Sequence, residues 1–214
     1  MLDPFDYADG LFENTYPHQC AVFSQKQIDW FIATLKGAAS QGLKVITMMH
    51  YSFGDNSVFN ETIAKSDANY YQDPFMIPDI IDAIQNKSVI SKTYADKAGV
   101  NNIIINEDFT SVSDLEFVVH LFGHIHSKNE YRCQKTDGSK KYDILMLGEA
   151  ALGTYGNALN KAYRYSGTIN EIAFSTISID PIEKAVYRVA YGSFLNYDKS
   201  NDVTDRVLKM SYRF

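Results

Sequence analysis

Three histidines have the residue type and the positions expected of metal ligands. His124 and His126 stand in the string Gly123-His124-Ile125-His126, which directly follows an apolar run. His50 directly follows another apolar run, earlier in the chain. Neutral imidazoles are the commonest protein ligands of metals such as zinc, manganese and iron. The sequence therefore predicts a metal site formed by His50, His124 and His126.

The two remaining histidines fit structural roles better. His120 lies inside the apolar run 117–122, so we expect a core histidine with a hydrogen-bond partner. His18 lies in an irregular segment and is predicted to be a surface residue. Alternate residues of an extended segment point to opposite sides, so His124 and His126 need not bind the same ion. Two adjacent ions sharing this loop would use that geometry.

Two predicted strands would bring the candidate ligands together. The runs 43–49 and 117–122 are short and nearly continuously apolar, which is typical of buried strands. In open α/β sheets, functional sites form outside the carboxyl ends of the strands. We therefore expect His50 and His124 to meet at one end of a sheet.

The remaining pattern predicts helices early in the chain and hairpins late. Ser24 and Gln27 form a capping box before apolar residues at helical spacing, and Gly42 is a stop signal. A second helix of about two turns is expected around residues 77–84. Two hairpins are predicted, with strands at 128–134 and 141–147 and at 171–179 and 183–191.

These elements predict an α/β fold in a single domain over residues 1–214. Residues 51–116 are interpreted as an insertion-like excursion, and 51–76, rich in Asn, Ser and Asp, are expected to lie at the surface. We find no repeat, low-complexity tract or linker that would divide the chain.

Composition excludes several classes of function. The chain has 20 Lys and Arg against 26 Asp and Glu, a net charge of −6, so bulk charge disfavours nucleic-acid binding. No apolar run is long enough to span a membrane. The acidic start, Met1–Asp6, is not a signal peptide, which favours a cytoplasmic location. Cys20 and Cys133 are too few for a disulfide framework, and we expect reduced thiols.

Several of these motifs also occur, in the same order, in a known family. The string 24–31, Ser-Gln-Lys-Gln-Ile-Asp-Trp-Phe, resembles the helix start S-x-x-Q-x-x-W-L of calcineurin-like metallophosphoesterases. A strand that ends in a ligand histidine follows there, as in 45–50, and then a G-H-x-H block, as in 123–126. The closing pattern I-D-x-x-x-x-x-V-x-R is similar to 179–188. The resemblance spans about residues 22–192 and combines four motifs.

The resemblance implies a β-sandwich flanked by helices and a metal-dependent phosphoesterase activity. In that family two divalent ions, of manganese, iron or zinc, activate a water that attacks a phosphate ester. Carried over by motif, His50 and His124 would contact one ion and His126 the other. No residue of this chain matches a general acid, so the catalytic residues other than metal ligands are unknown.

The early blocks of the family, D-x-H, G-D-x-x-D and G-N-H, are absent from this sequence. They supply the bridging carboxylate, an Asn ligand and the acidic histidine. The resemblance therefore implies that this chain is the C-terminal portion of such a domain. Its expected partners are the missing N-terminal segment and a phosphate-ester substrate, and its own site is expected to be incomplete.

Two other functions remain open. One is a mononuclear three-histidine metal hydrolase with an open water position. The other is a non-catalytic remnant of the phosphoesterase fold, with its aromatic residues (15 Tyr and 13 Phe) forming a binding face.

Overall fold

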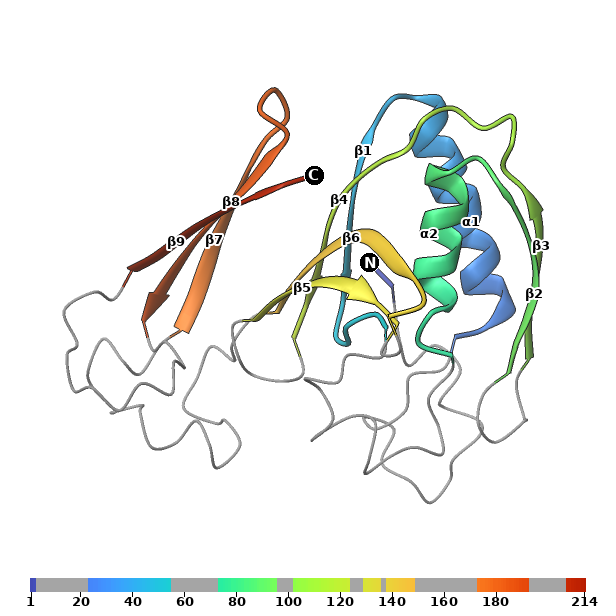
Figure 1. Cartoon of the computed structure of the whole chain (residues 1–214), viewed down its shortest axis with the longest axis horizontal. Helices are drawn as coiled ribbons and strands as arrows, with labels where there is room; N and C mark the ends of the chain where they lie inside the picture. The colour runs from blue at the N-terminus through green and yellow to red at the C-terminus, as the bar shows by residue number, and fades with distance from the viewer. Residues whose placement is uncertain are drawn as a thin grey trace, which may run out of the picture.

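Four strands form the central sheet. This computed structural model describes residues 1–2, 23–54, 73–95, 102–123, 129–135, 138–148, 173–192 and 207–214. Within them, β1 (Lys44–Met49), β4 (Glu116–Phe122) and β6 (Lys141–Gly148) run parallel, and β5 (Asn129–Gln134) pairs antiparallel with β6. The strand order is β1-β4-β6-β5, so β1 is an edge strand (Figure 1).

The register of the three parallel strands aligns their carboxyl ends. Met49 pairs with Phe122, and Phe122 pairs with Gly148. The predicted strands at 43–49 and 117–122 are both present, and the structure shows them to be direct neighbours in a parallel sheet.

Two helices cover one face of this sheet. In α1 (Gln25–Ser40), the Ser24 hydroxyl accepts a hydrogen bond from the Gln27 amide at 3.1 Å, which confirms the predicted N-cap. Gly42 follows the helix with φ +63°, a backbone angle that glycine adopts without strain. Helix α2 (Met76–Gln85) matches the second predicted helix.

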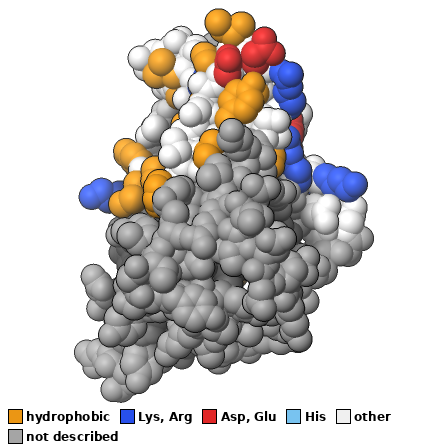
Figure 2. Space-filling model, turned by 90° about the vertical axis from the view of Figure 1, so that its left-hand side faces the viewer, with side chains coloured by type: hydrophobic (Ala, Val, Ile, Leu, Met, Phe, Trp, Pro, Cys, Tyr) orange, Lys and Arg blue, Asp and Glu red, His pale blue; other side chains and the backbone are white. Residues whose placement is uncertain are grey.

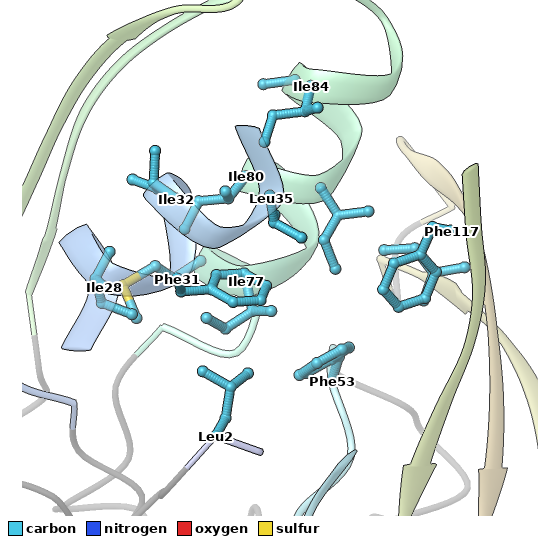
Figure 3. Close-up of a cluster of buried hydrophobic side chains, with 14 of the residues drawn as sticks. Leu2, Ile28, Phe31, Ile32, Leu35, Phe53, Ile77, Ile80, Ile84 and Phe117 are labelled. Carbon is cyan, nitrogen blue, oxygen red and sulfur yellow. The ribbon is translucent and has the colours of Figure 1, made fainter. Parts of the chain in front are cut away.

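The larger hydrophobic core lies between the helices and the sheet. Ile28 and Leu35 of α1 pack with Ile80 of α2, and Phe117 of β4 closes the cluster from the sheet side (Figure 3). Leu2 belongs to the same cluster. The 3.6-residue spacing of these apolar side chains explains why each helix turns one face to the sheet.

A hairpin that sequence analysis missed covers the other side of the helices. Strands β2 (Val89–Ala95) and β3 (Asn102–Asp108) pair antiparallel beside the helices (Figure 1). Their residues Tyr94, Ile103 and Ile105 belong to the larger hydrophobic core. Together with α2, they occupy much of the span 51–116 that we interpreted as an excursion.

A second, three-stranded sheet covers the opposite face of the central sheet. It consists of β7 (Ala173–Asp180), β8 (Ala185–Gly192) and β9 (Val207–Arg213), all antiparallel. A smaller apolar cluster joins the two sheets and is made by Val118, Val119, Leu145, Leu147 and Val186. Both predicted hairpins, β5–β6 and β7–β8, are present, while β9 was not predicted.

The described residues thus form a mixed α/β protein with helices on one face of the central sheet and strands on the other. Phe174 and Tyr187 of the three-stranded sheet are exposed. Figure 2 shows hydrophobic side chains among polar and charged ones on the described part of this side of the molecule. None of the helices in the described ranges is long and apolar enough to cross a membrane.

Candidate functional site

His50 lies at the carboxyl end of β1, beside the start of the G-H-x-H motif. The amide of Gly123 donates a hydrogen bond to the His50 carbonyl at 3.1 Å. A Cβ atom placed on Gly123 would lie 3.7 Å from Nδ1 of His50. The His50 ring, which is exposed, therefore lies against the residue that immediately precedes His124 in the chain.

The other two predicted ligands, His124 and His126, lie outside the described residues. The convergence of the three histidines therefore stays a prediction. Among the residues that are described, no three His, Cys, Asp or Glu side chains come close enough to hold an ion.

The carboxyl end of β6 lies at the same edge of the sheet and is packed tightly. A Cβ atom on Gly148 would come within 2.8 Å of Cζ of Phe122, so only glycine fits there without movement. Nη2 of Arg188 donates to the Gly148 carbonyl at 2.6 Å, and Nε donates to Oγ of Ser175 at 3.2 Å. Arg188 is buried and joins the two sheets, a role that the closing motif had not indicated.

His120 is the core histidine that the sequence predicted. Its side chain is fully buried, Nδ1 lies 2.9 Å from the Thr47 hydroxyl, and Nε2 lies 2.9 Å from the Tyr51 carbonyl. Burial lowers the pKa of His120 to about 4, which outweighs the hydrogen bonds that favour the charged ring. The ring is therefore neutral at pH 7.

The chain turns inward directly after His50, which corrects the expectation of a surface excursion from residue 51. Tyr51, Ser52 and Phe53 are buried. Gly54 has φ +78°, and its amide bonds to the Pro74 carbonyl at 2.9 Å. The rings of Tyr51 and Phe53 pack in the same hydrophobic core as the helices. Residues 55–72 lie outside the described part of the chain.

A second polar cluster, centred on Asp79 of α2, lies away from this edge. The Asp79 carboxylate accepts hydrogen bonds from the hydroxyls of Tyr94 and Tyr142, both at 2.7 Å. Its oxygens lie 3.0 Å from Nζ of Lys92 and 3.4 Å from Nζ of Lys140. No local sequence pattern indicates this cluster, because its members are far apart in the chain and come from α2, β2, β6 and the turn before β6.

The electrostatics of the Asp79 cluster are those of a structural ion-pair network. Burial by itself would raise the pKa of Asp79, but hydrogen bonds from Tyr94, Tyr142 and Lys92, with the charge of Lys92, hold it below its ordinary value. Burial and the neighbouring carboxylate raise the pKa of both tyrosines. Asp79 is therefore charged and both tyrosines are neutral at pH 7.

Cys133 is not a candidate nucleophile. It is a buried free thiol whose pKa burial raises to about 12, so it carries a proton at neutral pH. This agrees with the expected reduced state, while Cys20 lies outside the described residues.

At the carboxyl edge, the described residues offer one exposed histidine, His50, whose carbonyl accepts a hydrogen bond from Gly123, the residue before His124. No family model matches the chain, and no curated protein matches it.

Proposed function

We propose that this chain is part of a metal-dependent phosphoesterase whose ions bind at the carboxyl ends of β1 and β4. The observation that carries the proposal is the 3.1 Å hydrogen bond from the Gly123 amide to the His50 carbonyl. Through this bond His50, which follows β1, lies beside Gly123, which follows β4 and directly precedes His124 in the chain. Two neighbouring parallel strands thus end side by side at the edge where α/β proteins build their sites.

His50, His124 and His126 would hold the ions, as neutral nitrogen ligands suited to manganese, iron or zinc. Following the motif, His50 and His124 would share one ion, and His126 would bind a second. Bound divalent ions would supply an activated water and would offset the charge of a phosphate ester. The residues of this chain would bind the ions and orient their ligands. His50 is exposed, and its carbonyl accepts a hydrogen bond from Gly123.

The layer order supports the fold that the family resemblance implies. Helices cover one face of the central sheet, and a second sheet covers the other. We infer that this is the C-terminal portion of a metallophosphoesterase-type sandwich.

Among the described strands, β1 lies at the edge of the central sheet and offers a place for the N-terminal segment that the proposal requires. Ile46 and Met48 expose 43% and 52% of their surface on this strand, which is unusual for apolar residues of a parallel sheet. The Leu2 amide already donates to the Met48 carbonyl at 3.1 Å. We infer that a further strand pairs here and supplies the carboxylate ligands that three neutral histidines lack.

The test compares this chain with a version extended upstream by its own reading frame. We expect the 214-residue chain to bind Mn²⁺ or Zn²⁺ weakly and to hydrolyse an aryl phosphate slowly. The extended chain should bind two ions per molecule and turn over faster, and His124→Ala should remove both gains. His18→Ala is the matched control and should change neither.

The other outcomes separate the alternatives. One tightly held ion per chain, with hydrolysis that depends on all three histidines, would replace the proposal by a mononuclear hydrolase. No His50-dependent metal binding in either version would leave a non-catalytic remnant and overturn the proposal. Two tightly held ions in the short chain would show that its own carboxylates, Asp55 among them, complete the site.

A further inference from the structure

We propose that His120 is a positioning residue that fixes the backbone carrying His50. As a neutral ring in β4, it would bond to β1 and to the segment that follows β1, and we call this set of contacts the His120 clasp. The contacts of His120 stand by themselves, whereas their importance for metal binding rests on the function proposed above.

The hydrogen bonds of His120 define its tautomer and its two partners. The Tyr51 carbonyl can only accept, so Nε2 carries the proton and donates to it at 2.9 Å. Nδ1 is then the acceptor, and the Thr47 hydroxyl donates to it at 2.9 Å. Tyr51 directly follows His50, and Thr47 lies in β1. The His120 ring therefore bonds both to the strand that precedes His50 and to the residue that follows it.

Two aromatic rings fix the plane of the imidazole. Phe53 stacks on it with a centroid distance of 3.6 Å and an angle of 18°. Phe122 lies nearly parallel to it, at 6.0 Å and 9°. Phe53 belongs to the segment after His50, and Phe122 directly precedes Gly123. His120 thus contacts residues close in the chain to His50 and to the G-H-x-H motif, the two parts of the candidate site.

A hydrophobic residue would not do the same at this position. Apart from His120 and its first residue, Glu116, strand β4 is apolar. A buried polar side chain in such a run destabilises the fold unless its hydrogen bonds are satisfied. The pKa of about 4 keeps the ring neutral at pH 7, so both hydrogen bonds persist there.

The experiment compares His120→Asn with His120→Gln in the full chain. The Gln side chain reaches the position of Nε2 and can donate to the Tyr51 carbonyl, whereas Asn reaches only the position of Nδ1. Thr47→Val, which removes the other hydrogen bond, provides a third variant with little risk to folding. Hydrogen exchange of the Gly123 amide, which bonds to the His50 carbonyl, is one readout. Co²⁺ titration, followed by its visible absorption, is the second.

We expect His120→Asn to speed exchange at Gly123 about tenfold more than at Val119, in the middle of β4. It should also weaken His50-dependent Co²⁺ binding by about tenfold, the lower end of the effect of outer-shell partners on metal sites. His120→Gln should restore both readouts to within about twofold of the parent. A general loss of stability would instead raise exchange along the whole strand.

The controls keep this inference separate from the proposed function. If His50→Ala leaves Co²⁺ binding unchanged, the metal site is wrong, and the exchange at Gly123 still tests the clasp. If the Gly123 amide exchanges at the parent rate in both His120→Asn and His120→Gln, the proposed role of His120 is overturned. Equal Co²⁺ affinities in all variants, with His50-dependent binding, would overturn the positioning role.

Discussion

His120 and Asp79 are polar side chains that both tie the central sheet to its surroundings, but they do so by different physics. His120 is fully buried and neutral, and it relies on two hydrogen bonds and a stacked ring. Asp79 is charged, its side chain is 13% exposed, and it gathers two lysines and two tyrosines. The first lies beside the candidate site, and the second lies between α2, β2 and β6.

The difference shows what each place in the fold requires. Next to a site proposed to hold cations, a buried positive charge would repel the ions, so a neutral clasp suits the position. Where the outer hairpin meets the helices, partial solvent contact lowers the cost of burying charge, and an ion-pair network can span several elements. The two clusters should therefore respond differently to pH, substitution and salt.

The largest expected effect is a loss of stability on mild acidification that depends on His120. The folded-state pKa is about 4, below the ordinary value of 6.5, so the unfolded chain takes up its proton first as the pH falls. The free energy of unfolding should drop by about 3 kcal/mol between pH 6.5 and pH 4 through this group. Urea unfolding of the parent and of His120→Gln across this range measures the difference. Identical pH profiles would refute it.

Asp79→Asn should give the next largest effect. It removes the charge that two lysines face but keeps an oxygen for the tyrosines, so we expect a loss of about 2 kcal/mol at pH 7. Asp143→Asn is the matched control, since Asp143 is 82% exposed in its pair with Arg132. That change should cost less than about 0.5 kcal/mol. Equal losses in the two variants would show that the Asp79 network contributes no more than a surface pair.

The Asp79 cluster should lose its stabilising effect at a lower pH than His120 does. Because the pKa of Asp79 is held below its ordinary value, its stabilisation is present at neutral pH and is lost only as the pH falls below about 4. The difference between parent and Asp79→Asn should therefore stay constant from pH 7 to 5 and shrink below pH 4. A difference that already shrinks near pH 6 would contradict this.

Tyr94→Phe and Tyr142→Phe should each cost about 1 kcal/mol, the value of one buried hydrogen bond. Tyr94 belongs to β2 and Tyr142 to β6, so the two variants report on different attachments of α2. Hydrogen exchange should rise in β2–β3 for the first variant and in β5–β6 for the second. The exposed Tyr187→Phe serves as control and should leave both regions unchanged.

Salt should produce the smallest effect. Raising NaCl from 0.1 to 1 M shortens the screening length from about 10 to about 3 Å, which should weaken the partly exposed lysine contacts of Asp79 by about 0.5 kcal/mol. The contribution of His120, being neutral, should not change. The measurement is the effect of each substitution on unfolding free energy at the two salt concentrations. Equal salt sensitivity of the two sites would break the distinction between them.

Local chemistry explains what could be predicted about the fold. The Ser24 hydroxyl caps α1 within its own turn, and the Asp180 carboxylate accepts from the amides of Ile182 and Glu183 in the β7–β8 turn, both at 2.9 Å. Such interactions join residues two or three positions apart, so the sequence shows them directly. The apolar runs that became β1 and β4 are similarly local, and they were enough to predict that His50 directly follows a strand.

The missed elements depend on contacts that no local pattern reveals. Among the residues of β2, only Ile90 and Tyr94 are buried, so its period-two alternation is weak, and the strand is held by β3 and by the Tyr94 bond to Asp79. The position of His120 predicted a buried ring with a partner, but not that the partner would be the Tyr51 carbonyl.

The sequence by itself determined the apolar strands, the N-cap of α1, the turn between β7 and β8, and the choice of histidine at the positions of the candidate site. Only the tertiary structure decided that β1 and β4 are neighbours, that Gly123 bonds to His50, and that Arg188 reaches the end of β6. The physical reason is range: propensity and turn chemistry act over a few residues. Pairing and burial depend on which distant surfaces exclude water from each other, and this is settled only when the whole core forms.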